Sequence, residues 1–433
     1  MSRTTVFAVQ LRQRGLETFE KFSIAFGTAA ARAAVAERDP RLAGVIVSRS
    51  SFDRWAAGQL KGRPRREAAT VLRHLFDMPV DQLFQETGQG TGAEPFDSPA
   101  HISAQTHLLT GSNADPALLT MVDTSLTGII DRYEALGPHQ LAGEARLMRS
   151  MLHTLLAGRQ PPGPRAELFR LAAQTAGLLG YMAVNAGAGF ATVDAYCTEA
   201  EHLAREIGDT GTLMWTAGTR SLGLYYTGRY TEADVAARAG IDLAPDHPQA
   251  IRLLVNGRAR ALARTGDRRG AEAAIGKAMA LSDQQPVLPG GMTSCIAFTP
   301  YSMARTLANA ITARLSLGDT PDVLHHAAEI DTLLARSSSD WSRALVGLDV
   351  ATALLHQPTP EVEQAMDLGR TALTAGASAP IRSVWQRATE LHQQAARWDT
   401  QPSVRDYADM LHSWSSRPQA APVVAATATT PRF

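Results

Sequence analysis

The sequence is poor in cysteine and lysine, and it contains no long apolar run. Its two cysteines, Cys197 and Cys295, are too few and too far apart for a disulfide framework or a zinc site, so we expect both to be reduced. No stretch of about 18 apolar residues could span a bilayer, and the N-terminal MSRTTVFAVQLRQ lacks the apolar core of a signal peptide. We therefore expect a cytoplasmic protein with no membrane partner.

Aromatic residues are also scarce, at 6% of the chain, which makes an all-β fold a poor explanation of the sequence. The 433 residues are 45% hydrophobic, which is ample for the core of one long repeat structure or of two to three domains. Alanine, the residue with the highest helix propensity, dominates the composition. These features predict an all-α protein.

The familiar catalytic motifs are missing, including a phosphate-binding GxxxxGK[ST], an HExxH and a GxSxG. The glycine-rich stretch from Asn185 to Gly189 follows no predicted strand, so we interpret it as a helix break. His325 and His326 are adjacent and would point about 100° apart on a helix, which makes them a poor metal pair. We expect no enzymatic activity, no catalytic residues, no cofactor and no metal.

The net charge of zero hides an asymmetry. Residues 1–84 contain 14 Lys and Arg against 8 Asp and Glu, so this part carries +6 and the remainder −6. A basic module joined to a larger acidic one suggests a polyanion-binding domain on a body with another role. A solvated basic surface without a ligand is the alternative.

Composition shifts predict four segments along the chain. Residues 86–101 and the region near Ser112 are rich in Gly, Pro and Ser and lack periodicity, as expected of a linker, and the tail after Ser416 lacks helical periodicity. We predict a DNA-binding domain at 1–85, a linker at 86–116, a helical-repeat domain at 117–415 and a disordered tail at 416–433.

The segment VSRSSFDRWAAG predicts a short capped helix from Arg49 to Ala57. Ser48 is a favourable N-cap, and Gly58 is a natural stop. Phe52 and Trp55 fall on one helix face, where Leu16, Phe19, Phe22, Phe26 and Ala30 of an upstream helix would pack beneath them.

The other faces of this helix carry side chains that bind phosphates and base edges: Arg49, Ser50, Ser51 and Arg54. The next segment adds cations that could contact the DNA backbone: Lys61, Arg63, Arg65 and Arg66. We predict double-stranded DNA as the partner, with a plain helical bundle or a protein-docking module as the alternative.

Residues 5–84 resemble the helix-turn-helix regulators of the Cro/phage-repressor (XRE) superfamily, particularly its actinobacterial branch. The resemblance rests on VSRSSFDRWAAG, LKGRPR and VLRHLF in that order. It implies a recognition helix at Arg49–Ala57 and a homodimer that reads two half-sites about 34 Å apart. The connection RDPRLAGVIVS before this helix is longer than the turn of the motif.

Beyond residue 117, helical stretches alternate with short turns, and weak repeats are present. TGRYTEADVAARAGIDLAP aligns with TGDRRGAEAAIGKAMALSD, placing Gly228 on Gly266, and LGDTPDVLHHAAEIDTLL continues the pattern at Gly318. The pattern resembles the tetratricopeptide repeat, although the spacing departs from that family's 34 residues. It predicts an α-solenoid of antiparallel helix pairs with a concave face formed by first helices.

The repeat register predicts ligand-binding residues on that concave face: Trp215, Leu222, Tyr225, Asn256, Arg260, Arg305 and Asn309. Asn and Arg there can hold a peptide backbone or a carboxylate. Alternatively, the asparagines satisfy helix ends, the arginines form ordinary ion pairs, and Trp215 and Tyr225 belong to the core. Residues 284–300 form a lid or only a long connection.

Together these patterns predict a DNA-binding transcriptional regulator whose solenoid binds a peptide, small-molecule or protein ligand that controls operator binding. The alternative is a tetratricopeptide-like adaptor that does not bind DNA and mediates protein-protein interactions.

Overall fold

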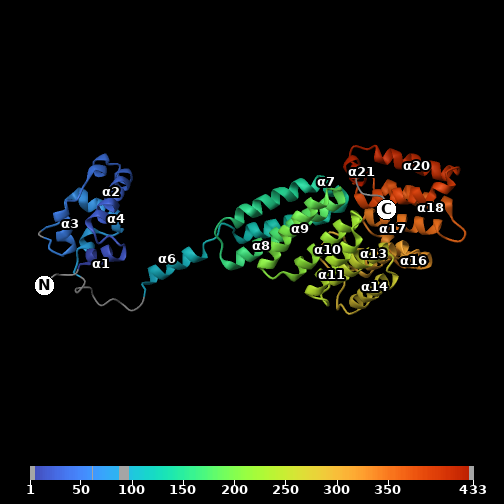
Figure 1. Ribbon diagram of the computed structural model, residues 1–433, viewed down its shortest axis with the longest axis horizontal. Coiled ribbons are helices and arrows are strands. Elements are labelled where there is room, and N and C mark those ends of the chain that lie inside the picture. Colours follow the sequence, from blue (N-terminus) through green and yellow to red (C-terminus); the bar gives the residue numbers. More distant parts are fainter. Residues whose placement is uncertain (1–4, 61, 87–96, 429–433) are drawn as a thin grey trace. The chain divides into compact units, whose positions relative to one another are not determined.

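The computed structural model describes residues 5–60, 62–86 and 97–428, and they are predominantly helical (Figure 1). No β-strand forms within these ranges, where an isolated bridge pairs Thr5 with Glu86. The chain divides into two compact units, Met1–Gln105 and Thr106–Phe433, which we call the head and the body. The prediction of an all-α protein is confirmed. Among the helices of the described ranges, none combines the length and apolarity that crossing a membrane requires.

The head is a bundle of short helices around a phenylalanine-rich core. Its helices are α1 (Val6–Gln13), α2 (Phe19–Ala36), the 3-10 helix η1 (Pro40–Gly44), α3 (Arg49–Ala56), α4 (Arg66–Phe76) and α5 (Val80–Leu83). The Val6 amide donates to the Gln85 carbonyl at 3.0 Å, so the two ends of the bundle lie together. Phe7 is fully buried, and its ring stacks on that of Phe84 at 5.1 Å.

Helix α3 agrees with the prediction of a capped helix from Arg49 to Ala57 to within one residue. The Ser48 hydroxyl accepts a hydrogen bond from the Ser51 amide at 3.2 Å, which caps the helix. Gly58 follows the helix with a φ of 66°, a backbone conformation that glycine adopts without strain. Local signals therefore place both ends of this helix.

The apolar face of α3 packs as two separate anchors. Phe52 contacts Phe22 of α2, as predicted, with ring centroids 4.9 Å apart. Trp55 packs instead against Phe7 and Phe84, at 6.2 and 5.8 Å. The helix is thereby fixed to α2 and to the two chain ends of the bundle, and its remaining faces point to solvent.

We expect Phe52→Ala to lower the free energy of unfolding of the head by about 3–5 kcal/mol, because a buried aromatic side chain is lost and a cavity remains. Hydrogen exchange of head amides in the intact protein measures this loss. Val35→Ala on α2 is the control, since Val35 is 81% exposed and its replacement should cost less than about 0.5 kcal/mol. Equal effects of the two substitutions would show that Phe52 is not a core residue.

The prediction of an aperiodic linker at 86–116 is wrong for part of its length. Residues 87–96 lie outside the described residues, but helix α6 (Pro99–Thr110) forms within the predicted linker. The Ser98 hydroxyl accepts from the His101 amide at 3.2 Å, and no glycine interrupts residues 99–110. None of the helix's side chains is buried, so it has no apolar periodicity that sequence analysis could detect.

The body begins with two long helices and continues with shorter ones. Its first helices are α7 (Pro116–Leu156), α8 (Pro162–Ala186), α9 (Phe190–Glu206), α10 (Thr210–Tyr226), α11 (Tyr230–Leu243), α12 (Gln249–Arg252), the π-helix η2 (Leu253–Ala259), α13 (Arg260–Arg264) and α14 (Arg268–Asp283). After a helix-free segment follow α15 (Met303–Ser316), α16 (Thr320–Ala335), α17 (Asp340–Leu355), α18 (Val362–Ala375), α19 (Arg382–Ala395), η3 (Ala396–Trp398), α20 (Pro402–Ser415) and α21 (Ala421–Ala428).

Glycines with positive φ make the turns that the repeat pattern predicted. Gly228, Gly266 and Gly318 have φ values of 79°, 79° and 72° and separate α10 from α11, α13 from α14 and α15 from α16. Consecutive helices contact one another from α7 to α11 and from α14 to α20. The three aligned glycines therefore mark equivalent corners between antiparallel neighbours.

Alternate helices form an inner layer that closes on itself. Contacts join α8 to α10, α10 to the α12–η2 segment, α13 to α15, α15 to α17 and α17 to α19, and α19 returns to α8. Further contacts join α19 to α10, where an Arg382 guanidinium N–H donates to the Tyr226 carbonyl at 2.5 Å, and α7 to α17, where the Tyr133 and Trp341 rings lie 5.1 Å apart. The inner helices thus surround a space instead of lining an open groove.

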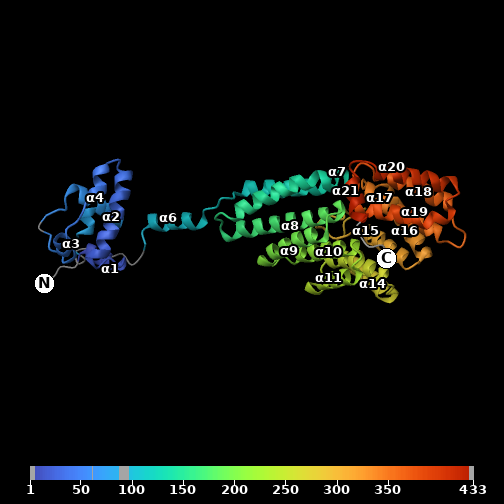
Figure 2. The same ribbon diagram turned by 45° about the horizontal axis from the view of Figure 1, so that its top comes forward.

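The predicted disordered tail is wrong for the described residues up to 428. Helix α21 contacts α8 and α19, and Val423 and Ala420 are buried (Figure 2). The alanine- and valine-rich sequence has little polar contrast, so its helical character comes from burial against the body.

Candidate functional site

The exposed face of α3 presents most of the predicted DNA-binding side chains of that helix. Arg49, Ser50 and Arg54 are exposed. The Ser51 hydroxyl lies 2.9 Å from that of Ser48, so it takes part in the helix cap. Arg54 Nε donates to the Ser50 carbonyl at 3.1 Å, which orients the guanidinium along the helix.

The loop after α3 and the start of α4 add further exposed arginines. Arg63, Arg65 and Arg66 are exposed, and Lys61 lies outside the described residues. Arg65 is the N-cap residue of α4, and no side chain caps that helix. The amides of its first turn, together with Arg65 and Arg66, form a surface that suits an anionic phosphate.

Two of these arginines form ion pairs that are easily exchanged. Arg49 lies 3.5 Å from Glu20, and Arg63 lies 3.2 Å from Asp81. All four side chains are at least 63% exposed, so each pair contributes little to stability. Both guanidiniums are therefore available to a stronger anionic partner.

The long connection before α3 folds as the 3-10 helix η1, which packs on α2. The Asp39 carboxylate caps it, accepting from the Arg41 amide at 3.1 Å. The Arg41 side chain also hydrogen-bonds to Asp39 and lowers the pKa of this carboxyl. α2 and α3 are therefore joined through an extra element and not through a tight turn.

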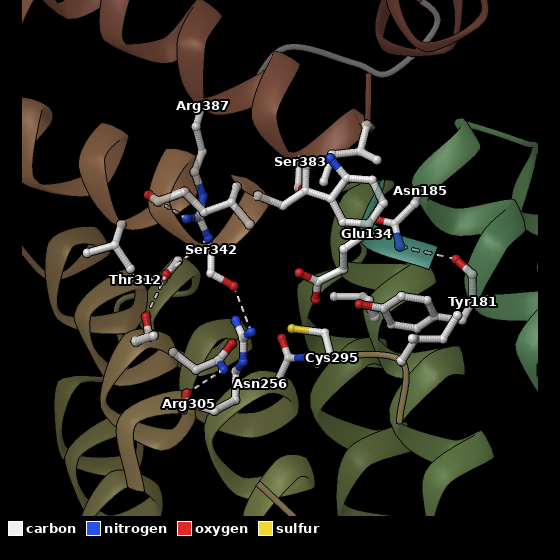
Figure 3. Close-up of a pocket in the computed structure, with 18 of the residues that line it drawn as sticks. Glu134, Tyr181, Asn185, Asn256, Cys295, Arg305, Thr312, Ser342, Ser383 and Arg387 are labelled. Atoms are coloured by element: carbon white, nitrogen blue, oxygen red, sulfur yellow. Dashed lines mark hydrogen bonds between the residues drawn. The ribbon is translucent and has the colours of Figure 1, made fainter. Parts of the chain in front are cut away.

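In the body, the ring of inner helices encloses a cavity of about 60 Å³, shown in Figure 3. The polar lining consists of Tyr133, Glu134, Tyr181, Asn185, Tyr226, Asn256, Arg260, Cys295, Arg305, Asn309, Thr312, Ser342, Ser383 and Arg387. The apolar lining includes Leu222, Ile296, Trp341, Leu345, Val346 and Ile381.

Five of the predicted concave-face residues line this cavity, namely Leu222, Asn256, Arg260, Arg305 and Asn309. Trp215 does not: it is fully buried, and its indole N–H donates to the Ala297 carbonyl at 3.0 Å. Tyr225 lies under Arg260, with the guanidinium carbon 4.3 Å from its ring centre, and it lines a smaller adjoining cavity.

Arg260 and Arg305 are 4% exposed, and neither forms an ion pair with a described residue. Arg260 donates to Asn256 Oδ1 at 2.5 Å and to the Tyr226 hydroxyl at 3.3 Å. Arg305 donates to the Thr293 carbonyl and the Ser342 hydroxyl, both at 2.7 Å. The alternative that these arginines form ordinary ion pairs is therefore wrong.

The two asparagines also serve the cavity wall and not helix ends. Asn256 Nδ2 donates to the buried Tyr301 hydroxyl at 3.2 Å, while its oxygen accepts from Arg260. Asn309 Nδ2 donates to the Arg305 carbonyl at 2.9 Å, one turn back on α15. Each asparagine thus lies next to one of the unpaired arginines.

Both guanidiniums stay charged in these surroundings. Burial opposes the charge of Arg260, but the neighbouring Tyr226 and Tyr225 outweigh it and raise its pKa. Burial also disfavours the charged form of Arg305, but Cys295 and Glu134 outweigh this effect and raise its pKa. Their side chains therefore contribute two positive charges to the wall.

Two backbone irregularities place polar groups in the wall. The π-helix η2 interrupts an otherwise α-helical run and carries Asn256, with Arg260 immediately after it; such insertions are frequent at functional sites. In α7, Gly137 has a non-helical φ of 78° and precedes Pro138, so the helix kinks just after Glu134. The kink lets α7 bend over the inner layer, where a Cβ on Gly137 would lie 3.0 Å from Ala379.

Residues 284–302 form no helix and cover part of the cavity. Ile296 is fully buried, and Cys295 contributes its sulfur to the lining (Figure 3). The Phe298 ring lies 4.5 Å from that of Trp215, and the Thr293 carbonyl accepts from Arg305. The insertion is therefore part of the cavity wall.

Several lining groups could not be predicted from the sequence because they come from distant segments. Glu134 and Arg387 approach the same cavity only when α7 and α19 close the ring (Figure 3). Neither belongs to an aligned repeat. The one local signal was the Gly-Pro pair after Glu134, which marks a bend near a charged residue.

His325, His326 and Glu329 are close enough to share a cation. His326 Nδ1 lies 2.7 Å from the Glu329 carboxylate, but its other ring nitrogen contacts Arg314. A guanidinium beside a ligand nitrogen repels a metal ion, so we interpret the group as an ion-pair cluster.

No protein-family model matches this chain, and no curated protein matches it.

Proposed function

We propose that the protein is a DNA-binding transcriptional regulator in which a helix-turn-helix head reads an operator and a tetratricopeptide-like solenoid body binds a signal ligand. The observation that carries the DNA-binding part is α3, a capped helix anchored by Phe52 and Trp55 whose exposed side presents Arg49, Ser50 and Arg54. A helix of this build fits the major groove, where arginine can bind guanine O6 and N7 together.

The remaining arginines suit the phosphate backbone. Arg63, Arg65 and Arg66 extend the basic surface from α3 to the start of α4. One recognition helix reads few base pairs, so we propose that a homodimer binds two half-sites about 34 Å apart. The bound ligand would control operator binding by favouring one arrangement of the paired heads, since a ligand shifts an equilibrium only through different affinities for its two states.

The cavity supports a sensing role for the body. It combines aromatic walls with two buried arginines that form no ion pair with a described residue, and its volume of about 60 Å³ leaves no room for a folded peptide or a protein surface. Of the ligand classes that the sequence predicts, the small molecule is therefore the one that we propose.

We expect the salt dependence of DNA binding to fall when a phosphate contact is removed. Fluorescence anisotropy of the protein on fragments of its own upstream region, at several salt concentrations, gives the slope of log K against log salt. Arg63→Ala should reduce this slope by about 1, because one fewer counterion is released. Arg269→Ala, an exposed arginine of the body, should leave the slope unchanged. A weak, salt-independent interaction would favour the adaptor.

A further inference from the structure

The wall of the body's cavity contains two buried arginines that form no ion pair with a described residue. Arg260 and Arg305 hydrogen-bond only to neutral groups among the described residues, and Arg260 Nε is buried with no hydrogen-bond partner. Leaving a guanidinium buried without a counter-charge is costly. A ligand anion placed against these two arginines and Asn256 would supply the missing charge.

One negatively charged residue, Glu134, lines the same cavity. Glu134 is half-buried and forms no ion pair with a described residue, and Figure 3 shows its oxygens pointing into the cavity. By contrast, Arg387 is already neutralised by Asp349 at 3.0 Å. The cavity thus offers two cationic groups and one anionic group, none of which forms an ion pair with a described residue.

Aromatic and apolar side chains form another part of the wall. Tyr133, Tyr181 and Trp341 come from α7, α8 and α17, and the Tyr133 ring lies within 6.0 Å of the other two. Burial raises the pKa of Tyr133, so its hydroxyl stays protonated, and it accepts from Asn185 at 3.1 Å. The apolar part of a ligand would therefore contact uncharged aromatic rings.

We infer that the body binds a small zwitterion of the free amino-acid class, with its carboxylate on Arg260 and Arg305, its ammonium group on Glu134 and an apolar side chain against the aromatic wall. The cavity size excludes longer peptides in this conformation. The inference rests on the proposed sensing function of the body and names its ligand.

The test uses the full-length protein without DNA. The twenty L-amino acids are screened one by one for a rise in the melting temperature, and those that act are titrated by calorimetry. The N-acetyl and carboxamide derivatives of the best ligand are then compared with it. We expect each derivative to bind at least about tenfold more weakly, because each loses a charged hydrogen bond.

Glu134→Gln and Arg305→Gln assign the two ends of the ligand. Glu134→Gln should weaken binding of the free amino acid at least about tenfold but leave binding of the N-acetyl derivative unchanged. Arg305→Gln should likewise weaken binding of the free amino acid but leave binding of the carboxamide derivative unchanged. Glu144→Gln is the control, since Glu144 is on the same helix but pairs with Arg132 at the surface. Glu134→Gln keeps the test valid should the buried Arg305 variant fail to fold.

Failure to bind any of the twenty amino acids would overturn the inference, as would derivatives that bind as tightly as the free amino acid, or an unchanged affinity for the free amino acid in Glu134→Gln. DNA binding by the same preparation separates the two claims. Operator binding without amino-acid binding overturns the inference alone, whereas amino-acid binding without DNA binding supports it and overturns the proposed regulator.

Discussion

Replacing Arg49 and Arg54 together by alanine is expected to weaken binding to a specific operator by about 2–6 kcal/mol, or roughly 30-fold to 20,000-fold. Each arginine projects from the solvent side of α3, where a bidentate contact to a guanine is worth about 1–3 kcal/mol. Fluorescence anisotropy with a labelled operator measures the change. The fold of the head should persist, because Phe52 and Trp55 anchor the helix.

Arg269→Ala together with Arg336→Ala is the matched control for this experiment. Both residues are exposed and lie in the body, so the double variant removes the same charge without touching α3. Its operator affinity should equal that of the unaltered protein. If both double variants lose the same affinity, binding depends on net charge alone, and α3 is not a recognition helix.

A second large effect is expected at a buried ion pair of the body, beside the smaller of the two adjoining cavities. Asp349 is 3% exposed at its side chain, pairs with Arg387 at 3.0 Å and accepts from Thr312 at 2.7 Å. Asp349→Ala leaves the Arg387 guanidinium largely buried without a counter-charge, which should cost about 3–5 kcal/mol of the free energy of unfolding. Chemical denaturation followed by tryptophan fluorescence reports on this unit, because five of the six tryptophans lie in it.

Asp367→Ala is the comparison for that measurement. Asp367 also pairs with an arginine, Arg370 at 3.0 Å, but its side chain is 69% exposed. Removing an exposed ion pair should cost less than about 1 kcal/mol. Similar small losses for both variants would show that water reaches Asp349 and that the wall of the cavity is not closed.

The sequence predicts α3 to within one residue because its signals are local. Ser48 caps the helix, Gly58 ends it, and Phe52 and Trp55 define its buried face, all within eleven residues. For the connection RDPRLAGVIVS before α3, only the length could be taken from the sequence. Its 3-10 helix is stabilised by packing on α2, which periodicity does not encode.

The cavity could be predicted in part. The repeat register identifies Asn256, Arg260, Arg305 and Asn309 because they occupy equivalent inner positions of successive first helices. It also misplaces Trp215, since an aromatic residue at an inner position can equally well fill the core. A repeat pattern describes neighbouring helices, whereas the closure from α19 back to α8 joins residues about 200 positions apart.

Helices α6 and α21 could not be predicted from the sequence either, for two different reasons. α6 buries no side chain, so its sequence lacks the apolar stripe that usually reveals a helix. Helix α21, with its buried Val423, packs against α8 and α19. α8 lies far earlier in the chain, and α20 separates α19 from α21. Composition alone therefore describes both segments as linker or tail.

Sequencing of genomic fragments captured by the purified full-length protein shows whether α3 selects particular DNA sequences. We expect a limited set of enriched fragments that share a two-fold related motif, with the enrichment lost in the Arg49→Ala, Arg54→Ala variant and retained in the Arg269→Ala, Arg336→Ala variant. Uniform recovery of all fragments, or no recovery at physiological salt, would contradict this expectation and favour the adaptor.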